Sequence, residues 1–313
     1  MLAFCVPMMA PACLGQPCRA DLLLLEAGSN RILRYDDLTG VYNGVFAEAD
    51  IRTNGSADMV FGPDGNLFVS DTQGQRILRY HGLTGAFLGV FAGAEAFEFS
   101  LPGEMAFDPN GDLLVSASNQ IRKIDGRTGQ SLGVFVEGTR NAIFQRLQFG
   151  ADGNLYAIER DAHDIKRFNG ITGAFIGNLL DGSRFFEPTD FVLDDDGAIF
   201  ISDYSSGNGL FRYDAGSSIV WDSVDDRTEF INTQPLIHGH LLTISRDGTL
   251  LVLNRDPGRE TLLRFNEVTG SFIELVHRGG LRALALTPLV PEPGAWVLVT
   301  IAACGSTLFR GRW

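Results

Sequence analysis

The chain has 313 residues, of which 45% are hydrophobic and 20% are charged, so it is long enough to bury a large core. Acidic residues outnumber basic ones by 38 to 25, and the formal net charge of −13 argues against a nucleic-acid partner, because phosphate binding depends on Lys and Arg. All 4 cysteines lie near the two ends, which excludes disulfides, a thiolate metal site and a cysteine nucleophile from the region between them.

Residues 1–20 predict a signal peptide. Residues 2–14 are apolar, are too few to span a bilayer as a helix, and are followed by small and polar residues. No Lys or Arg precedes the apolar run, and cleavage is expected after Ala20. The alternative, a buried first strand, is interrupted by Pro7 and Pro11. We therefore expect the chain to be exported.

Residues 21–289 contain a repeat of about 44 residues. An Asp/Gly-rich turn between two apolar strands recurs at Gly65, Gly111, Gly153, Gly197 and Gly248. A second turn, Thr-Gly after a basic strand, recurs at Gly40, Gly85, Gly129, Gly173 and Gly270, with Ala215-Gly216 in the equivalent place. The two series interleave throughout, so the period belongs to a structural unit and not to composition.

The unit from residue 57 to residue 92 predicts four short strands. Their sequences are DMVFG, NLFVSD, QRILRY and AFLGVF, and residues that favour tight turns join them. Four antiparallel strands in about 44 residues is the geometry of one β-propeller blade. A closed ring of such blades also leaves no long sheet edge exposed.

The two ends of the repeat region predict how this ring closes. Residues 22–47 match the second, third and fourth strands of a blade, whose first strand is absent there. Residues 281–288, LRALALTP, match that missing first strand. We therefore predict an all-β, six-bladed β-propeller of four-stranded antiparallel blades, closed by the C-terminal strand completing the N-terminal blade.

Three segments of the clearest unit carry a resemblance to a known family. Asp64-Gly65-Asn66, Asp71 and Ile77-Leu78-Arg79-Tyr80 resemble the corresponding positions of NHL-type propeller repeats. The resemblance extends over residues 21–288 and implies the propeller fold. This architecture hosts lyases, lactonases and binding modules, so the resemblance does not select among these functions.

One rim of the predicted ring gathers polar residues, because the first strand of each blade starts there and the second strand ends there. The candidate ligand-binding residues on this rim are Glu26, Asp58, Asp71, Glu104, Arg146, Glu159, Asp190, Asp203, His238, His240 and Asn254. Clustered carboxylates suit a divalent cation such as Ca²⁺, with Glu104, Asp58 and Asp190 as candidate ligands. Alternatively, these acids accept hydrogen bonds from loop N–H groups and between blades, and Arg146 would oppose a cation.

Two functions are compatible with this rim. Gly103-Glu104 resembles the Gly-Glu pair of gluconolactonase-like six-bladed propellers, which implies a metal-dependent hydrolase or lyase with Glu104, Asp190 and His240 as candidate catalytic residues. The Asn ligand of that family has no counterpart in this sequence. We therefore expect, in the first place, a binding or scaffold module that engages an extracellular protein or polysaccharide at the channel mouth.

Residues 290–313 predict a sorting tail. Pro291-Glu292-Pro293 is followed by an apolar run of about 15 residues and then by Arg310 and Arg312. This order resembles the bacterial PEP-CTERM signal, which implies a short transmembrane helix, processing by an exosortase-type transpeptidase, and a link to the cell envelope and exopolysaccharide. The alternatives are a plain membrane anchor or a last core helix. With the leader, the tail predicts that residues 21–289 lie outside the cytoplasmic membrane.

Overall fold

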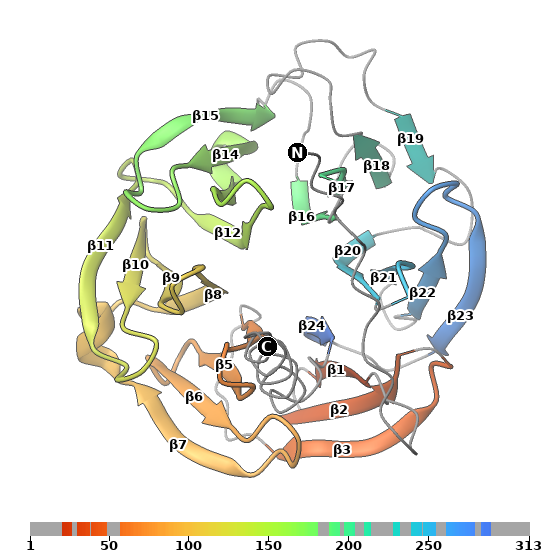
Figure 1. Cartoon of the computed structure of the whole chain (residues 1–313), viewed down its shortest axis with the longest axis horizontal. Helices are drawn as coiled ribbons and strands as arrows, with labels where there is room; N and C mark the ends of the chain where they lie inside the picture. Colours follow the sequence, from red (N-terminus) through yellow and green to blue (C-terminus); the bar gives the residue numbers. More distant parts are fainter. Residues whose placement is uncertain are drawn as a thin grey trace, which may run out of the picture.

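The computed structural model describes residues 21–26, 30–37, 39–48, 57–180, 188–194, 197–203, 210–213, 228–231, 239–245, 247–254, 261–278 and 283–288. These residues form six four-stranded antiparallel sheets around a central axis (Figure 1). The predicted all-β six-bladed propeller is confirmed. The leader with Ala20 and the tail with Pro291, Glu292, Pro293, Arg310 and Arg312 lie outside the described residues. Within the described ranges, no helix has the length and apolarity needed to cross a membrane.

The six blades are called I to VI, and the strands of each blade are given from the innermost to the outermost. Blade I contains β24 (Ala283–Pro288), β1 (Asp21–Glu26), β2 (Arg31–Asp36) and β3 (Tyr42–Glu48). Blade II contains β4 (Met59–Phe61), β5 (Leu67–Asp71), β6 (Arg76–Tyr80) and β7 (Phe87–Ala92). Blade III contains β8 (Pro102–Phe107), β9 (Leu113–Ala117), β10 (Gln120–Ile124) and β11 (Ser131–Glu137).

The second half of the chain repeats this order. Blade IV contains β12 (Phe144–Phe149), β13 (Leu155–Glu159), β14 (Asp164–Phe168) and β15 (Phe175–Leu180). Blade V contains β16 (Pro188–Leu193), β17 (Ile199–Asp203), β18 (Leu210–Tyr213) and β19 (Thr228–Ile231). Blade VI contains β20 (Gly239–Ile244), β21 (Leu250–Asn254), β22 (Thr261–Phe265) and β23 (Phe272–Arg278). Two short 3-10 turns, η1 (Ala94–Phe97) and η2 (Arg160–Ala162), lie in connections.

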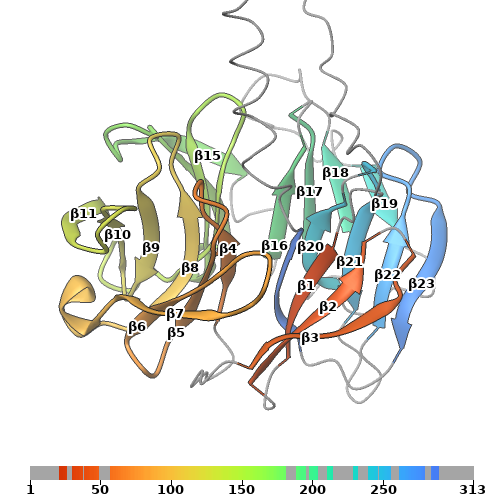
Figure 2. The ribbon, with the colours of Figure 1, turned by 60° about the horizontal axis from the view of Figure 1, so that its bottom comes forward.

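Blade I is built from both ends of the repeat region. Strand β24 pairs antiparallel with β1, so that Leu22 lies opposite Pro288 and Leu24 opposite Leu286. Figure 2 shows β24 as the blue strand alongside the red β1, and among the described strands no other blade combines distant parts of the sequence. The predicted ring closure is therefore confirmed.

The core is divided into six layers, each shared by two neighbouring blades. Leu23 of blade I packs in one cluster with Leu67 of blade II, and the ring ends with a cluster that joins Leu251 of blade VI to Leu22 of blade I. All four side chains are at most 1% exposed. Fully burying a leucine contributes about 1.5–3 kcal/mol, so each blade depends on its two neighbours for most of its stability.

The recurrent Thr-Gly turn is also explained by packing between blades. A Cβ atom on Gly85 would lie 1.9 Å from the carbonyl oxygen of Phe46 in the preceding blade, and one on Gly129 would lie 1.8 Å from that of Phe91. Both glycines have positive φ angles, of 70° and 73°. Only glycine fits there, because any side chain would push the turn away from the outer strand of the preceding blade.

Candidate functional site

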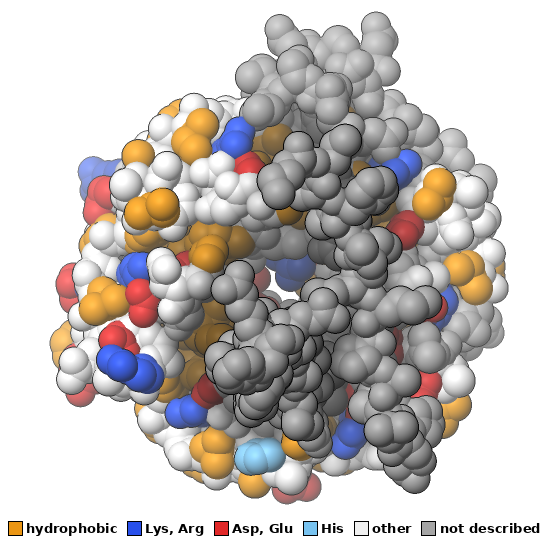
Figure 3. Space-filling model, in the orientation of Figure 1, with side chains coloured by type: hydrophobic (Ala, Val, Ile, Leu, Met, Phe, Trp, Pro, Cys, Tyr) orange, Lys and Arg blue, Asp and Glu red, His pale blue; other side chains and the backbone are white. Residues whose placement is uncertain are grey.

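The candidate site lies where the inner strands enter the sheets, at the mouth of the central channel. Figure 3 shows an opening on the ring axis in this view, with basic and acidic side chains near its edge. The pairing register shifts near the start of several inner strands, for instance across Arg146 in β12 and Thr189 in β16. Arg146 has a positive φ of 41°, as expected for an extra residue in a bulge. These irregularities turn side chains at the strand starts away from the regular pleat.

Asp58 links blade II to blade III. Its Oδ1 accepts a hydrogen bond from the backbone N–H of Met59 at 2.8 Å, and its Oδ2 accepts one from Met105 of the next blade, also at 2.8 Å. The side chain is buried. Both carboxylate oxygens of Asp58 are therefore committed to backbone amides.

Asp190 repeats this arrangement three blades further round the ring. Its Oδ1 accepts the N–H of Phe191 at 2.8 Å, and its Oδ2 accepts the N–H of Leu242 in blade VI at 2.7 Å. Asp190 is also buried, with 1% of its surface exposed. The same device thus joins blades II and III and blades V and VI.

Arg146 joins blade IV to blade V. Its Nε donates to the carbonyl oxygen of Phe191 at 3.1 Å and lies 3.2 Å from Oδ1 of Asp190. On the same strand, Gln148 both donates to the carbonyl oxygen of Leu193 and accepts from its N–H, at 3.2 and 3.1 Å. The side chain of Arg146 keeps 22% of its surface exposed, so part of the guanidinium remains accessible.

Glu104 completes an electrostatic group with these three residues. Burial raises the pKa of Glu104 well above its usual value, the charges of Asp58 and Asp190 raise it further, and Arg146 opposes the shift. Burial likewise raises the pKa of Asp58 to about 6 and raises the pKa of Asp190. We call Asp58, Glu104, Arg146 and Asp190 the channel group.

The carboxylates at the ends of the second strands are arranged differently. Three of them form an ion pair within their own hairpin, and these pairs are Glu26–Arg31 at 2.8 Å, Asp71–Arg76 at 2.7 Å and Glu159–Lys166 at 2.5 Å. Glu26 and Arg31 are direct cross-strand neighbours, as are Asp71 and Arg76. The structure therefore does not bring these three acids into the channel group. A basic residue early in the third strand was the signal in the sequence for this pairing.

The side chains of the remaining candidates on the predicted rim lie outside the described part of the structure. His238 lies outside the described residues. The backbones of Asp203, His240 and Asn254 belong to β17, β20 and β21, but their side chains are outside the described part of the structure.

The channel group does not fit a divalent cation. In the described ranges, no three His, Cys, Asp or Glu side chains form a set that could hold a metal ion. A cation would have to share the carboxylate oxygens of Asp58 and Asp190 with backbone amides, and Arg146 places a positive charge beside Asp190 that would repel it. A calcium site built from Glu104, Asp58 and Asp190 therefore conflicts with the donors present.

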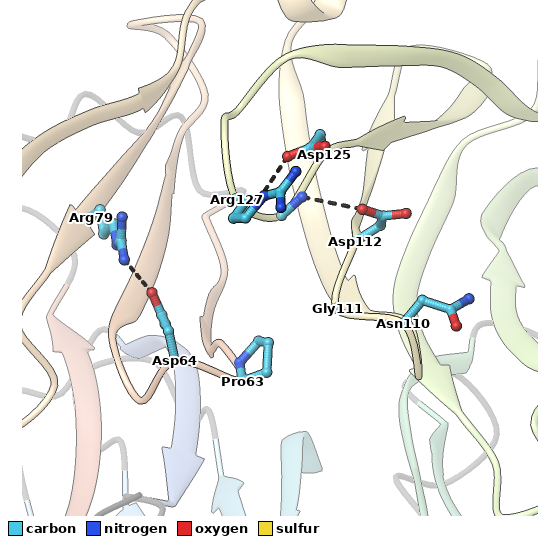
Figure 4. Close-up of a pocket in the computed structure, with 9 residues that line it drawn as sticks. Pro63, Asp64, Arg79, Asn110, Gly111, Asp112, Asp125 and Arg127 are labelled. Atoms are coloured by element: carbon cyan, nitrogen blue, oxygen red, sulfur yellow. Dashed lines mark hydrogen bonds and ion pairs between the residues drawn. The ribbon is translucent and has the colours of Figure 1, made fainter.

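A separate cavity of about 480 Å³ lies between blades II and III, at the turns that join first to second and third to fourth strands (Figure 4). Its polar lining includes Asp64, Arg79, Asn110, Asp112, Asp125 and Arg127. Sequence reasoning missed this cavity. The signal that was available is Arg127, which occupies a turn position that is apolar in the four other blades with a Thr-Gly turn.

Comparison with known proteins shows a shared fold. No family model matches the chain, and no curated protein matches its sequence. A chain of the nidogen–laminin complex superposes with a TM-score of 0.63 at 14% identity, over 87% of this chain and 98% of that one. A gluconolactonase from Xanthomonas campestris gives 0.57 at 14% identity, over 87% and 85%. Virginiamycin B lyase from Staphylococcus aureus gives 0.56 at 16% identity, over 81% and 78%. Identities this low establish the propeller fold and leave function to the site.

Proposed function

We propose that this propeller is a non-catalytic binding or scaffold module that engages a protein or glycan at the channel mouth. One observation carries the proposal: the carboxylates that a hydrolytic metal centre would need, Asp58 and Asp190, hold neighbouring blades together through backbone amides. Acids that hold backbone amides in this way stabilise the ring, and Arg146 beside Asp190 disfavours a divalent cation at the same place.

The parts of the channel group that remain partly exposed are Glu104 and Arg146. They offer an acceptor or donor carboxyl group and a guanidinium to a partner at the rim. Arginine suits this role because its planar fork binds carboxylate or amide oxygens in a fixed geometry. Both residues are held by contacts outside the strand ladder, because the N–H of Glu104 donates to Oγ of Ser116 at 2.9 Å and Nε of Arg146 donates to the carbonyl oxygen of Phe191 at 3.1 Å.

Metal analysis tests the proposal most directly. We expect no stoichiometric divalent ion in the purified protein after dialysis, and no change in Tm on adding a chelator. A tightly held ion that Glu104→Gln releases would overturn the proposal. Binding itself is measured on arrays of envelope glycans and proteins, with Glu104→Gln as the variant that removes the acid at the rim.

The alternative function is a hydrolase or lyase of the gluconolactonase-like kind. The raised pKa of Glu104 favours it, because shifting a carboxyl group toward neutral pH is how enzymes prepare a general acid. The fold shared with a gluconolactonase is compatible with it. Lactone hydrolysis by the wild-type protein that Glu104→Gln abolishes, while the fold is retained, would establish this alternative.

Location and sorting are part of the same proposal and depend on the two ends of the sequence. We propose export through a leader at residues 1–20 and sorting at Pro291-Glu292-Pro293 by an exosortase-type transpeptidase, with membrane attachment through the tail before processing. The protein would then act in the cell envelope or at the extracellular surface. Mass spectrometry of both native termini tests this, because intact ends in the mature protein would contradict it.

A further inference from the structure

The cavity between blades II and III is a second candidate site, distinct from the channel mouth. It lies at the turn end of the blades, whereas the channel group lies at the opposite end of the same inner strands. Its volume of about 480 Å³ falls within the range of about 300–1,000 Å³ that is typical of small-molecule sites. Figure 4 shows its wall formed by one turn of blade II and two turns of blade III.

Blade III breaks the repeat at this cavity. The residue before Thr-Gly is Leu38, Leu83, Ile171 and Val268 in the other four blades that carry this turn. Folding needs no charge at this position, because an apolar residue occupies it in the other four blades even where it is exposed, as Ile171 is with 82% of its surface. In blade III the residue is Arg127, which lines the cavity. The turn geometry does not require arginine, so Arg127 is the residue that distinguishes this turn from the other four.

Arg127 and Asp125 keep polar groups available for a ligand. The backbone N–H groups of Arg127 and Thr128 donate to Oδ1 of Asp125 at 3.0 and 2.8 Å, and the bonds from Thr128 are the main cause of a lowered pKa at Asp125. Asp125 is therefore an ionised acceptor whose Oδ2 receives no hydrogen bond from the described residues. The charge of Arg127 also contributes to the lowered pKa of Asp125, but among the described residues its guanidinium forms no ion pair within 4.0 Å.

The other charges of the cavity are already neutralised. Arg79 pairs with Asp64 in blade II, and Asp112 accepts hydrogen bonds from Gly126 at 3.3 Å and from Lys123, whose Nζ lies 3.0 Å away. The unpaired donor is thus a single guanidinium surrounded by hydrogen-bond acceptors. Three aspartates line the cavity and repel a phosphate dianion about twice as strongly as a single carboxylate, whereas a free cation would meet two arginines.

We propose that this cavity binds a sugar acid, with its carboxylate on Arg127 and its hydroxyl groups on Asp125 and neighbouring acceptors such as Asn110. A guanidinium and a carboxylate match as a bidentate pair, and hydroxyl groups supply the donors that fixed carboxylates lack. The proposal is independent of ligand binding at the channel mouth.

Calorimetric titration of the whole protein with D-glucuronate and with D-glucose tests the proposal. We expect saturable binding of D-glucuronate that exceeds binding of D-glucose at least about tenfold, because a charge-assisted hydrogen bond is lost with the neutral sugar. Arg127→Leu should reduce D-glucuronate binding to the level of D-glucose. This variant restores the residue that blade II has in the same turn, so its Tm should match that of the wild type.

Leu83→Arg is the matched control, since it adds an arginine to the equivalent turn of blade II and should leave D-glucuronate binding unchanged. Uronate oligomers that bind more tightly than the monomer would identify a polysaccharide as the source of the ligand, and equal affinities would identify the free sugar acid. No saturable binding of D-glucuronate at about 1 mM, equal binding of D-glucose, or full binding by Arg127→Leu would each overturn the proposal.

Discussion

Acidic residues are used differently at the two ends of the blades. At the turn end they pair within one blade, as Asp152 does with Arg167 at 2.5 Å, a contact between residues 15 apart in the sequence. At the channel end, Asp58 and Asp190 bind amides of the next blade, 47 and 52 residues away. Acids therefore stabilise single hairpins at both ends, as Glu26, Asp71 and Glu159 do at the channel end, and only Asp58 and Asp190 among those compared also join neighbouring blades.

Removal of β24 should have the largest effect. Truncation before Leu281 leaves the inner edge of β1 unpaired and uncovers the layer between blades VI and I. We therefore expect the protein to aggregate and to lose its cooperative unfolding transition. Truncation after Leu289 is the control and should keep the native fold. Thermal melts by circular dichroism and gel filtration measure both. A native monomer without β24 would show that closure does not hold the blades together.

Asp190 and Asp152 compare the two ends directly. Asp190→Ala leaves two buried N–H groups and Arg146 without their acceptor, and we expect a loss of about 3 kcal/mol in the free energy of unfolding. Asp152→Ala removes a partly exposed ion pair together with hydrogen bonds from Asn154 and Tyr156, and should cost about 1 kcal/mol. Urea unfolding curves give both values. Equal losses would contradict the distinction between inter-blade and intra-blade acids.

The raised pKa values of the channel group predict an unusual pH dependence. An acid whose pKa is higher in the folded than in the unfolded state binds a proton more readily when folded, so stability from Asp58 and Glu104 should fall as pH rises from about 4 to 6 and beyond. Glu104→Gln removes one of the two groups. It should raise the free energy of unfolding at pH 7 by about 1 kcal/mol and leave it unchanged near pH 4.

Urea unfolding of the wild type and of Glu104→Gln, at several pH values from about 4 to 7, measures the effect. Acids at the turn end behave in the opposite sense, because hydrogen bonds lower the pKa of Asp125 and stability from it is lost on acidification. The difference between wild type and Glu104→Gln isolates the channel group from that background. A difference that does not grow with pH would refute the assignment of a raised pKa to Glu104.

The smallest expected effect is the response of the two kinds of ion pair to salt. A double-mutant cycle on Asp152 and Arg167 should give a coupling of about 0.5 kcal/mol that is largely lost at about 1 M salt. The same cycle on Arg146 and Asp190 should give a larger coupling that changes little, since Asp190 is buried. Equal salt sensitivity would show that both ends of the blades are equally open to solvent.

Much of the fold could be predicted because its determinants are local. Turn residues and strand length fall within each repeat of about 44 residues, so the predicted strand NLFVSD agrees with β5 (Leu67–Asp71) to one residue. The blade that begins at residue 22 lacks its first strand, and residues 281–288 supply an extra one, so the sequence predicted that the two ends join in one blade. The reason for the repeated Gly85 needed the structure, since the carbonyl that it approaches belongs to Phe46 of another blade.

The site was predicted less completely. The sequence by itself placed Asp58, Glu104, Arg146 and Asp190 at equivalent strand starts, and therefore near one channel mouth. Only the tertiary structure decided what their side chains do, because the amides of Met105 and Leu242 reach these carboxylates through the packing of one blade against the next. The cavity beside Arg127 likewise exists only between two packed blades. Local pattern determines strands and turns, whereas the environment of a charge depends on distant residues that folding brings beside it.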